Sequence, residues 1–86
     1  MPELSRFLGI SILMYFDDHS PPHFHVKYND HRALISIGDF RLLEGHLPAR
    51  VLGLVMEWAE LHKDELVKNW DMVKTMGRYF KIAPLV

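Results

Sequence analysis

The spacing of the apolar residues along this chain changes at Pro48. Before it, apolar and polar side chains alternate over short segments, a pattern typical of strands with one covered face. After it, apolar residues recur every three or four positions as far as Met76, which is typical of helix. Strands followed by helix predict an α+β fold, in which a meander of four or five mainly antiparallel strands packs against a C-terminal helical segment.

Four segments before Pro48 have the strand pattern. The first is apolar on both faces, which favours a central strand or one that is covered on both sides. The later ones alternate and are separated by turn-forming residues. The expected strands are Phe7–Phe16, His23–Tyr28, Arg32–Ile37 and Phe40–Glu44, with a loop over Asp17–Pro22, turns at Asn29-Asp30 and Gly38-Asp39, and a further edge strand at Arg78–Leu85.

The helical segment spans Pro48–Met76, because Pro48 suits a first helical turn and Gly77 suits a C-terminal cap. As one straight helix it would be roughly 43 Å long, since each residue adds about 1.5 Å. A compact chain of this size has a diameter of about 30 Å. We therefore expect one kinked helix or two helices, with the break around His62-Lys63. The alternative is a long helix that projects and packs on a partner.

Composition excludes several classes of protein. With 86 residues, 49% of them hydrophobic, we expect one folded domain over residues 1–86. The chain has no cysteine, which excludes disulfides, thiolate catalysis and cysteine-ligated zinc. Its longest apolar run is too short for a bilayer and its start does not resemble a signal peptide, so we expect a cytoplasmic protein without a membrane partner. The net charge of −1 means that any anion site must be a local patch.

Three histidines lie close together in the segment HSPPHFH, residues 19–25. An imidazole can act as general acid, general base or metal ligand near neutral pH. The two prolines favour an extended backbone, and alternate residues of a strand point to the same face. We therefore predict that His23 and His25 share a solvent-accessible face with Lys27, whereas Phe24 and Val26 are buried.

A basic surface follows if both turns are two-residue loops. Like charges that face each other on a sheet are unfavourable unless an anion such as phosphate lies over them. The alternative is that Lys27 and Arg32 splay into solvent. In this register Lys27 faces Arg32, His25 faces Leu34, His23 faces Ser36 and Ser36 faces Arg41. The open face of the sheet would then have no carboxylate. It would carry the side chains of His23, His25, Lys27, Arg32, Ser36 and Arg41.

Four stretches of the sequence resemble one small prokaryotic family: MPELSRFLGI, YFDDHSPPHFHVKY, LEGHLP and EWAELHKDELVKNW. The family is the domain-of-unknown-function family 4160, and the resemblance covers essentially the whole chain. It implies a neighbouring gene for a second small protein, of the domain-of-unknown-function family 2442. The pair resembles a toxin–antitoxin module in which the histidine-bearing protein is the toxin. The short turn at Gly38-Asp39-Phe40 departs from the family pattern.

The first functional interpretation is a toxin that cleaves RNA without a metal. Such cleavage needs a base for the 2′-hydroxyl, an acid for the leaving 5′-oxygen and cations for the phosphate. One of His23 and His25 would be the base, and the other, or His19, the acid. We prefer this interpretation because nearby cations would repel a divalent metal ion. The expected catalytic residues are His19, His23 and His25, and the expected phosphate-binding residues are Lys27, Arg32 and Arg41.

Two alternatives remain open. In one, three histidines and a carboxylate hold zinc or another divalent ion of a metal-dependent hydrolase; the ligands would be His19, His23, His25 and Asp17 or Asp18. In the other, the chain is a non-enzymatic module that binds or blocks a partner, and His23 is structural, for instance through an Nδ1 bond to the loop backbone. We expect a small cognate antitoxin-like protein as partner, and the thin core of so short a chain also allows a homodimer.

Overall fold

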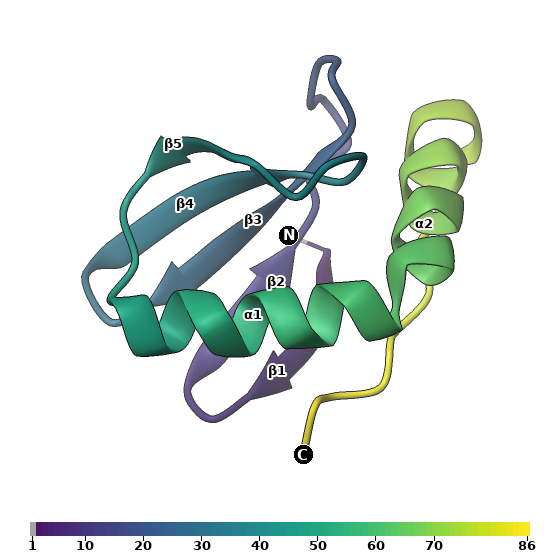
Figure 1. The fold of residues 1–86 in the computed structure, drawn as a ribbon. Helices are drawn as coiled ribbons and strands as arrows, with labels where there is room; N and C mark the ends of the chain where they lie inside the picture. The colour runs from purple at the N-terminus through teal and green to yellow at the C-terminus, as the bar shows by residue number, and fades with distance from the viewer. Residues whose placement is uncertain (1) are drawn as a thin grey trace.

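The computed structural model describes residues 2–86, which form one five-stranded sheet and two helices (Figure 1). Each strand pairs antiparallel with its neighbours, and the strands lie in the sheet in their sequence order. The predicted α+β meander with a C-terminal helical segment is confirmed. The elements are β1 (Glu3–Phe7), β2 (Ile10–Leu13), β3 (His23–Tyr28), β4 (His31–Ser36), β5 (Leu42–Gly45), α1 (Ala49–Leu61) and α2 (Lys63–Met76).

The first hairpin corrects the predicted strand Phe7–Phe16. That segment contains the end of β1, a turn at Leu8-Gly9, β2 and the start of the following loop. Leu8 and Gly9 both have positive φ, 50° and 78°, as in the tight turns that join twisted strands. The prediction failed because Leu8 is apolar, so the run of hydrophobic residues shows no break at the turn.

The central hairpin has the predicted register. A two-residue turn at Asn29-Asp30 joins β3 to β4 and pairs Lys27 with Arg32. Asn29 has the positive φ, 51°, that such a short turn requires. The same register gives the other two predicted pairs, His25 with Leu34 and His23 with Ser36.

The next turn is longer than predicted. The backbone N–H of Ser36 donates to Arg41 O at 2.8 Å, so these two residues lie opposite each other as expected. However, β5 begins at Leu42 instead of Phe40, because Phe40 has a φ of 55° and cannot continue a strand. A bulge beyond Leu42 then shifts the register of the rest of β5.

The helical segment divides at His62, as predicted. His62 has a φ of −121° and a ψ of 25°, outside the helical range, so α1 ends at Leu61 and α2 begins at Lys63. Gly77 ends α2 with a positive φ of 64°, which glycine adopts without strain. In Figure 1, α1 lies across one face of the sheet and α2 turns away at the far end of α1. No helix within residues 2–86 is both long and apolar enough to span a membrane.

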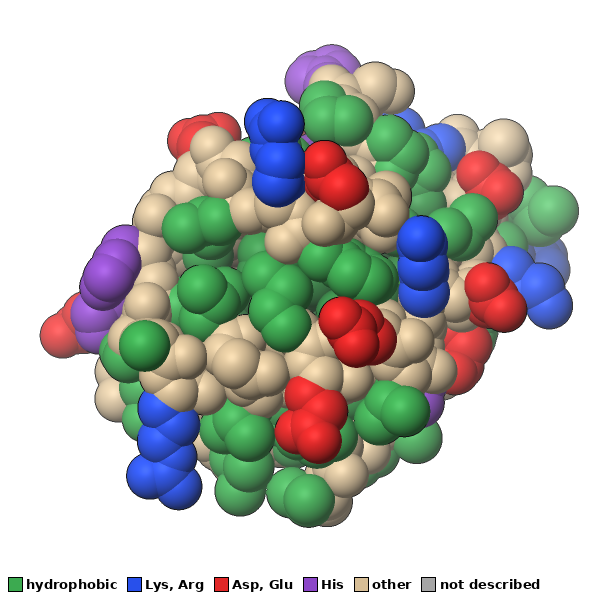
Figure 2. Space-filling model, in the orientation of Figure 1, with side chains coloured by type: hydrophobic (Ala, Val, Ile, Leu, Met, Phe, Trp, Pro, Cys, Tyr) green, Lys and Arg blue, Asp and Glu red, His purple; other side chains and the backbone are tan. Residues whose placement is uncertain are grey.

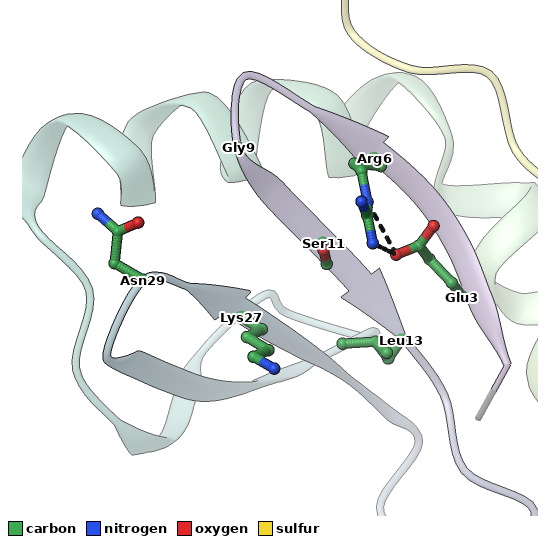
Figure 3. Close-up of a pocket in the computed structure, with 7 residues that line it drawn as sticks. All are labelled: Glu3, Arg6, Gly9, Ser11, Leu13, Lys27 and Asn29. Carbon is green, nitrogen blue, oxygen red and sulfur yellow. Dashed lines mark hydrogen bonds and ion pairs between the residues drawn. The ribbon is translucent and has the colours of Figure 1, made fainter.

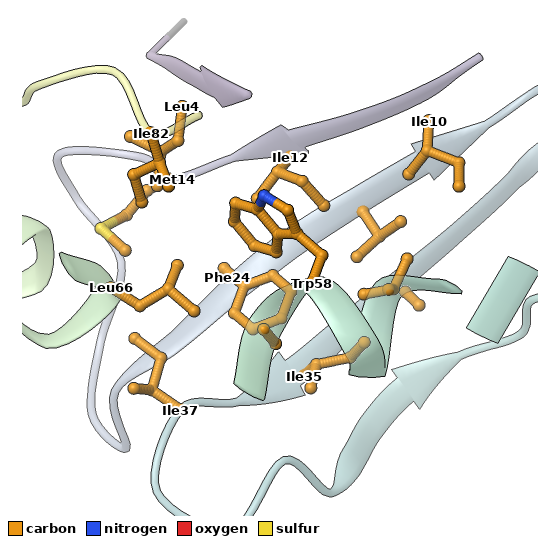
Figure 4. Packing of buried hydrophobic residues seen from close by; sticks show 14 of the residues in the cluster. Leu4, Ile10, Ile12, Met14, Phe24, Ile35, Ile37, Trp58, Leu66 and Ile82 are labelled. Atoms are coloured by element: carbon orange, nitrogen blue, oxygen red, sulfur yellow. The ribbon is translucent and has the colours of Figure 1, made fainter. Parts of the chain in front are cut away.

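The core lies between α1 and the sheet face that carries Phe24 and Val26 (Figure 4). Trp58 of α1 is fully buried there, and its ring lies 6.1 Å from that of Phe24. Phe24 and Val26 are buried, as strand alternation predicts. The opposite face of the sheet, which we call the open face, carries His25 and Lys27.

The C-terminal segment corrects the predicted edge strand Arg78–Leu85. Residues 78–86 form no strand, although the Ile82 N–H donates to Leu4 O of β1 at 2.8 Å. The buried side chain of Asn69 instead holds this segment, because it bonds both the N–H and the C=O of Phe80. A backbone that is satisfied by a side chain in this way has fewer groups left for a ladder with β1.

Candidate functional site

One cluster of titratable side chains lies at the end of the open face where β3 begins. His23 and His25 project from β3 to this face, because residues two apart on a strand point the same way. Asp18 comes from the β2–β3 loop and approaches both rings. One possible ligand atom from each residue lies within 4.8 Å of the other two. We call Asp18, His23 and His25 the Asp–His cluster.

His23 is the most enclosed member of the cluster. Its Nδ1 lies 2.8 Å from Pro21 O, and because a carbonyl oxygen only accepts, Nδ1 carries the proton. The ring of Trp70 packs beside the imidazole at 5.4 Å, and only 6% of His23 is exposed. The prediction that His23 is solvent-accessible is therefore wrong, because the β2–β3 loop and α2 cover it. The bond to Pro21 is the kind of structural contact that the non-enzymatic interpretation includes.

His25 directs its Nε2 at the same carboxylate. This atom lies 3.0 Å from Asp18 Oδ1 and 3.2 Å from Oδ2. The ring of Tyr15 meets the imidazole edge-on at 4.4 Å, and 22% of the His25 side chain is exposed. His25 is thus oriented by two neighbours and still reached by solvent, so it is the histidine of the cluster that a substrate can approach.

Asp18 joins the loop to both histidines. Its Oδ2 accepts the backbone N–H of Tyr15 at 2.9 Å, which fixes the carboxylate in the loop. Its Oδ1 lies 3.5 Å from the Nε2 of His23 and 3.0 Å from that of His25. Two imidazole nitrogens and one carboxylate oxygen form a ligand set that suits zinc and similar divalent ions.

A hollow of about 550 Å³ opens beside the cluster. Asp18 and His23 form part of its wall, so small molecules can approach the cluster from this side. His19 also lines the hollow, but it is exposed and lies outside the cluster. Of the three predicted histidines, the structure brings His23 and His25 together. The other lining residues are Asp17, Ser20, Pro21, Leu34, Leu43 and Glu44.

Next to the cluster, cationic residues cross the open face in one row. Strand pairing places Arg6 opposite Ser11, Ser11 opposite Lys27, and Lys27 opposite Arg32. Arg6, Lys27 and Arg32 are exposed, and we call these three residues the basic row. A second hollow, of about 420 Å³, includes Arg6, Ser11 and Lys27 in its wall (Figure 3).

Arg6 was missed by sequence reasoning because β1 was not recognised. A bulge in β1 between Glu3 and Ser5 interrupts the strict alternation that would have marked this strand. Arg6 also forms an ion pair with Glu3, with 2.8 Å between Nη2 and Oε2. The third predicted phosphate-binding residue, Arg41, lies instead at the β4–β5 turn, with its Nε 4.0 Å from Asp39.

The prediction that the open face has no carboxylate is wrong. Glu3 stands opposite Leu13 of β2, and Glu44 stands opposite Leu34 of β4. Together with Asp18, these side chains place negative charge around the cluster. Glu3 comes from β1, which was not predicted, and Glu44 comes from the part of β5 beyond the bulge, whose register differs from the predicted one.

The side of the molecule that carries α1 shows a different distribution of charge. In Figure 2, Lys and Arg side chains alternate with Asp and Glu side chains among hydrophobic ones, and no patch of one sign gathers in this view. The basic row is therefore a local feature of the open face, as a net charge of −1 requires.

Comparison with known proteins gives one match. No curated protein and no solved structure matches the chain significantly. The model of the domain of unknown function DUF4160 matches residues 9–71, which include the Asp–His cluster and the basic residues of β3 and β4, but not Arg6. Because this match spans more than half of the chain, the protein belongs to the DUF4160 family.

Proposed function

We propose that this protein is the toxin-like member of a two-gene module and that it acts on RNA in the cytoplasm. RNA binds on the open face and is cleaved beside the Asp–His cluster. The observation that carries the proposal is the position of the cluster beside the basic row, on the same face of β3 as Lys27. Lys27 follows His25 by two residues, so the two are about 6.6 Å apart along the strand. A nucleic acid strand that lies across the row therefore passes the cluster.

The basic row supplies the contacts to phosphate. Lys27 and Arg32 face each other across the hairpin, an unfavourable pair of like charges in the isolated protein. A phosphate that binds both side chains removes this repulsion and gains charge-assisted hydrogen bonds. Arg6 contributes less, because Glu3 already neutralises part of its charge. We therefore expect Lys27 and Arg32 to be the main RNA-binding residues.

The orientation of the histidines favours metal-dependent over metal-free chemistry. In metal-free RNA cleavage, one imidazole takes a proton from the 2′-hydroxyl and another donates one to the leaving oxygen. In the cluster, both Nε2 atoms face Asp18, and the Nδ1 of His23 is bonded to Pro21. This arrangement favours the alternative in which the two imidazoles and the carboxylate act together on one cation, with His25 as the accessible residue.

The proposal includes a small antitoxin-like partner. The open face is the part of the protein that RNA would need, so a partner that covers Lys27 and Arg32 would block binding without touching the cluster. A homodimer through the same face would have the same effect. A complex of the two purified proteins that releases its partner when RNA is added would support a shared surface.

A second candidate function is a non-enzymatic binding module. The bond between His23 and Pro21 O and the low exposure of His23 favour it, since they are also what a purely structural histidine shows. In that case the cluster stabilises the β2–β3 loop and has no chemistry. The two candidates predict different effects on RNA cleavage when only His25, the accessible histidine, is replaced.

The test is to express the chain alone and together with its genetic neighbour, and to follow growth and RNA integrity. The wild type is expected to slow growth and degrade RNA when expressed alone, and the neighbour should suppress both effects. His25→Ala should abolish both, whereas the matched control His46→Ala, at an exposed position outside the cluster, should not. Toxicity that persists in His25→Ala without RNA cleavage would establish the binding module instead.

RNA binding itself is tested by its dependence on salt. The affinity for a single strand falls as salt rises, and each phosphate contact adds about 0.7 to the steepness of log K against log salt concentration. Lys27→Ala and Arg32→Ala should each make this dependence less steep by about that amount and weaken binding to all sequences similarly. Lys68→Ala, an exposed position on α2, serves as the control. Equal slopes for all four proteins would show that RNA does not use the basic row.

A further inference from the structure

We propose that Asp18, His23 and His25 bind one divalent transition-metal ion of the zinc type. The inference deepens the proposed function by naming the group that acts beside the bound RNA, and in that respect it rests on that function. The binding site itself follows from the contacts of the cluster with its surroundings and does not depend on RNA. Three features carry it: the proton positions on His23, the spacing of the ligand atoms and the contacts that support them.

The proton on His23 leaves two electron-rich atoms facing each other. Because Pro21 O only accepts, the Nδ1 of His23 is the donor in their bond. In a neutral imidazole, Nε2 then carries a lone pair, and it faces Asp18 Oδ1 at 3.5 Å in a largely buried site. A nitrogen lone pair and a carboxylate oxygen repel each other at this distance. The contact becomes favourable when His23 gains a second proton or when a cation lies between the two atoms.

The distances from Asp18 to the two rings fit one small ion. Zinc binds histidine nitrogen and carboxylate oxygen at about 2.0–2.2 Å in a tetrahedron, so its ligand atoms lie roughly 3.3–3.6 Å from one another. Asp18 Oδ1 is 3.5 Å from the Nε2 of His23 and 3.0 Å from the Nε2 of His25. A shift of a few tenths of an ångström by the loop residue Asp18 brings both of these distances to the tetrahedral spacing, and the ligand atoms of the two rings lie within 4.8 Å of each other.

Neighbouring groups hold the ligands as they do in metal sites. A histidine that binds a metal usually donates its other N–H to a carbonyl or carboxylate, which fixes the ring and its tautomer. His23 has this contact with Pro21 O. The Tyr15 N–H binds Oδ2 of Asp18, which leaves Oδ1 directed at the two rings. Both ligands would therefore be positioned before the ion arrives.

The ligand set determines the class of ion and its use. Two nitrogens among three ligands favour zinc and related transition metals over magnesium or calcium. The cations of the basic row oppose binding less than adjacent cations would, since the strand neighbours of His25 are Leu13 and Leu34 and Lys27 lies two residues further along β3. Three protein ligands leave a position for water or a phosphate oxygen, and the hollow beside Asp18 and His23 gives access to it.

The experiment uses untagged protein freed of metal with a chelator and titrates it with zinc chloride in a calorimeter. One zinc per chain is expected, and magnesium at the same concentration should not bind. Cobalt, used as a spectroscopic substitute, should give the visible absorption of a tetrahedral nitrogen–oxygen site. Asp18→Asn and His25→Ala should each weaken zinc binding by at least about 100-fold, a loss larger than that from disturbing a supporting contact. His46→Ala, which also removes an imidazole, should leave the affinity unchanged.

Circular dichroism of each variant separates loss of binding from loss of folding, and Asp18→Asn keeps the shape of the side chain it replaces. Zinc binding that is absent, or equal in the wild type and both folded variants, would overturn the metal site. RNA cleavage that continues in chelator by a protein without zinc affinity would do so too, and it would leave the proposed function standing. Zinc binding of the expected kind without any RNA cleavage would support the site and refute the proposed function.

Discussion

The two ends of the open face lie on the same strand and differ in how they meet solvent. His23 at the start of β3 is 6% exposed, whereas Lys27, two alternations further along, is exposed. The Asp–His cluster is enclosed by the β2–β3 loop and by Trp70 of α2. The side chains of the basic row are exposed to solvent.

This difference shows that the strand alternation sets the face of a side chain but not its accessibility. An enclosed end can fix the orientation of imidazole rings, because their hydrogen bonds do not compete with water. An exposed end suits a long, mobile polyanion, which binds through many weak and salt-sensitive contacts. The following predictions test this division of roles, beginning with the largest expected effect.

Removing the Trp70 side chain, which covers His23, should have the largest effect on stability. Trp70→Ala deletes a side chain that is 7% exposed and that packs on His23, and we expect a loss of about 3 kcal/mol in the free energy of unfolding. Val67→Ala, at an exposed position of the same helix, should change it by no more than about 0.5 kcal/mol. Urea unfolding measures both. Similar small losses in the two variants would mean that α2 does not enclose the cluster.

Replacing the enclosed His23 should have the second largest effect on stability. His23→Ala leaves Pro21 O without its donor, opens a cavity beside Trp70 and removes a partner of Asp18, so we expect a loss of about 2 kcal/mol. The exposed His46→Ala should lie within about 0.5 kcal/mol of the wild type. Thermal unfolding in the presence of a chelator isolates the packing effect from any bound metal. If the two variants unfold alike, His23 is not held as described.

At the open end, a change that weakens RNA binding should stabilise the protein. Lys27→Glu converts a like-charge pair with Arg32 into an opposite-charge pair, which should add about 0.2–1 kcal/mol to the free energy of unfolding. The free energy of unfolding of Lys27→Gln, which only removes the repulsion, should lie between those of the wild type and Lys27→Glu. RNA affinity should decrease in the opposite order. A loss of stability in Lys27→Glu would show that Lys27 and Arg32 do not interact across the hairpin.

The smallest effect concerns the β4–β5 turn. The backbone N–H of Arg41 donates to Asp39 Oδ1 at 3.2 Å and, with Ser36, holds the pKa of the Asp39 carboxyl below its ordinary value. A lowered pKa stabilises the folded state at pH values above the unfolded-state pKa, and this contribution disappears as the pH falls through the folded-state pKa. Asp39→Asn should therefore lower the midpoint of thermal unfolding slightly at pH 7, with no difference at strongly acidic pH. An equal difference at both pH values would contradict this origin.

The sequence predicted the fold best where local signals were sufficient. The hairpin of β3 and β4 has clear alternation and a turn of two polar residues, Asn29-Asp30, so its register could be read directly. The length of the helical segment, which exceeds the diameter of a compact chain of this size, predicted that it is broken. The β1–β2 hairpin was missed because Leu8, an apolar residue, occupies its turn. The C-terminal segment was mistaken for a strand because the side chain that holds it, Asn69, lies in α2.

The candidate site was predictable in part. The shared face of His23 and His25 followed from their spacing, and the pairing of Lys27 with Arg32 followed from the turn. The enclosure of His23 did not, because Trp70 lies 47 positions further along the chain and reaches it only when α2 folds back. Arg6 belongs to the basic row because β1 pairs with β2, and this pairing was not predicted.

The sequence by itself determined the order of the elements from β3 to α2, the face on which each β3 side chain lies, and the presence of imidazoles and cations on one face. These depend on backbone periodicity and on turns, which act over a few residues. Only the tertiary structure decided that the Asp18 carboxylate lies between two imidazoles and that one end of the open face is enclosed. Those contacts join a loop, a strand and a distant helix, and they form because packing around the core brings the elements together.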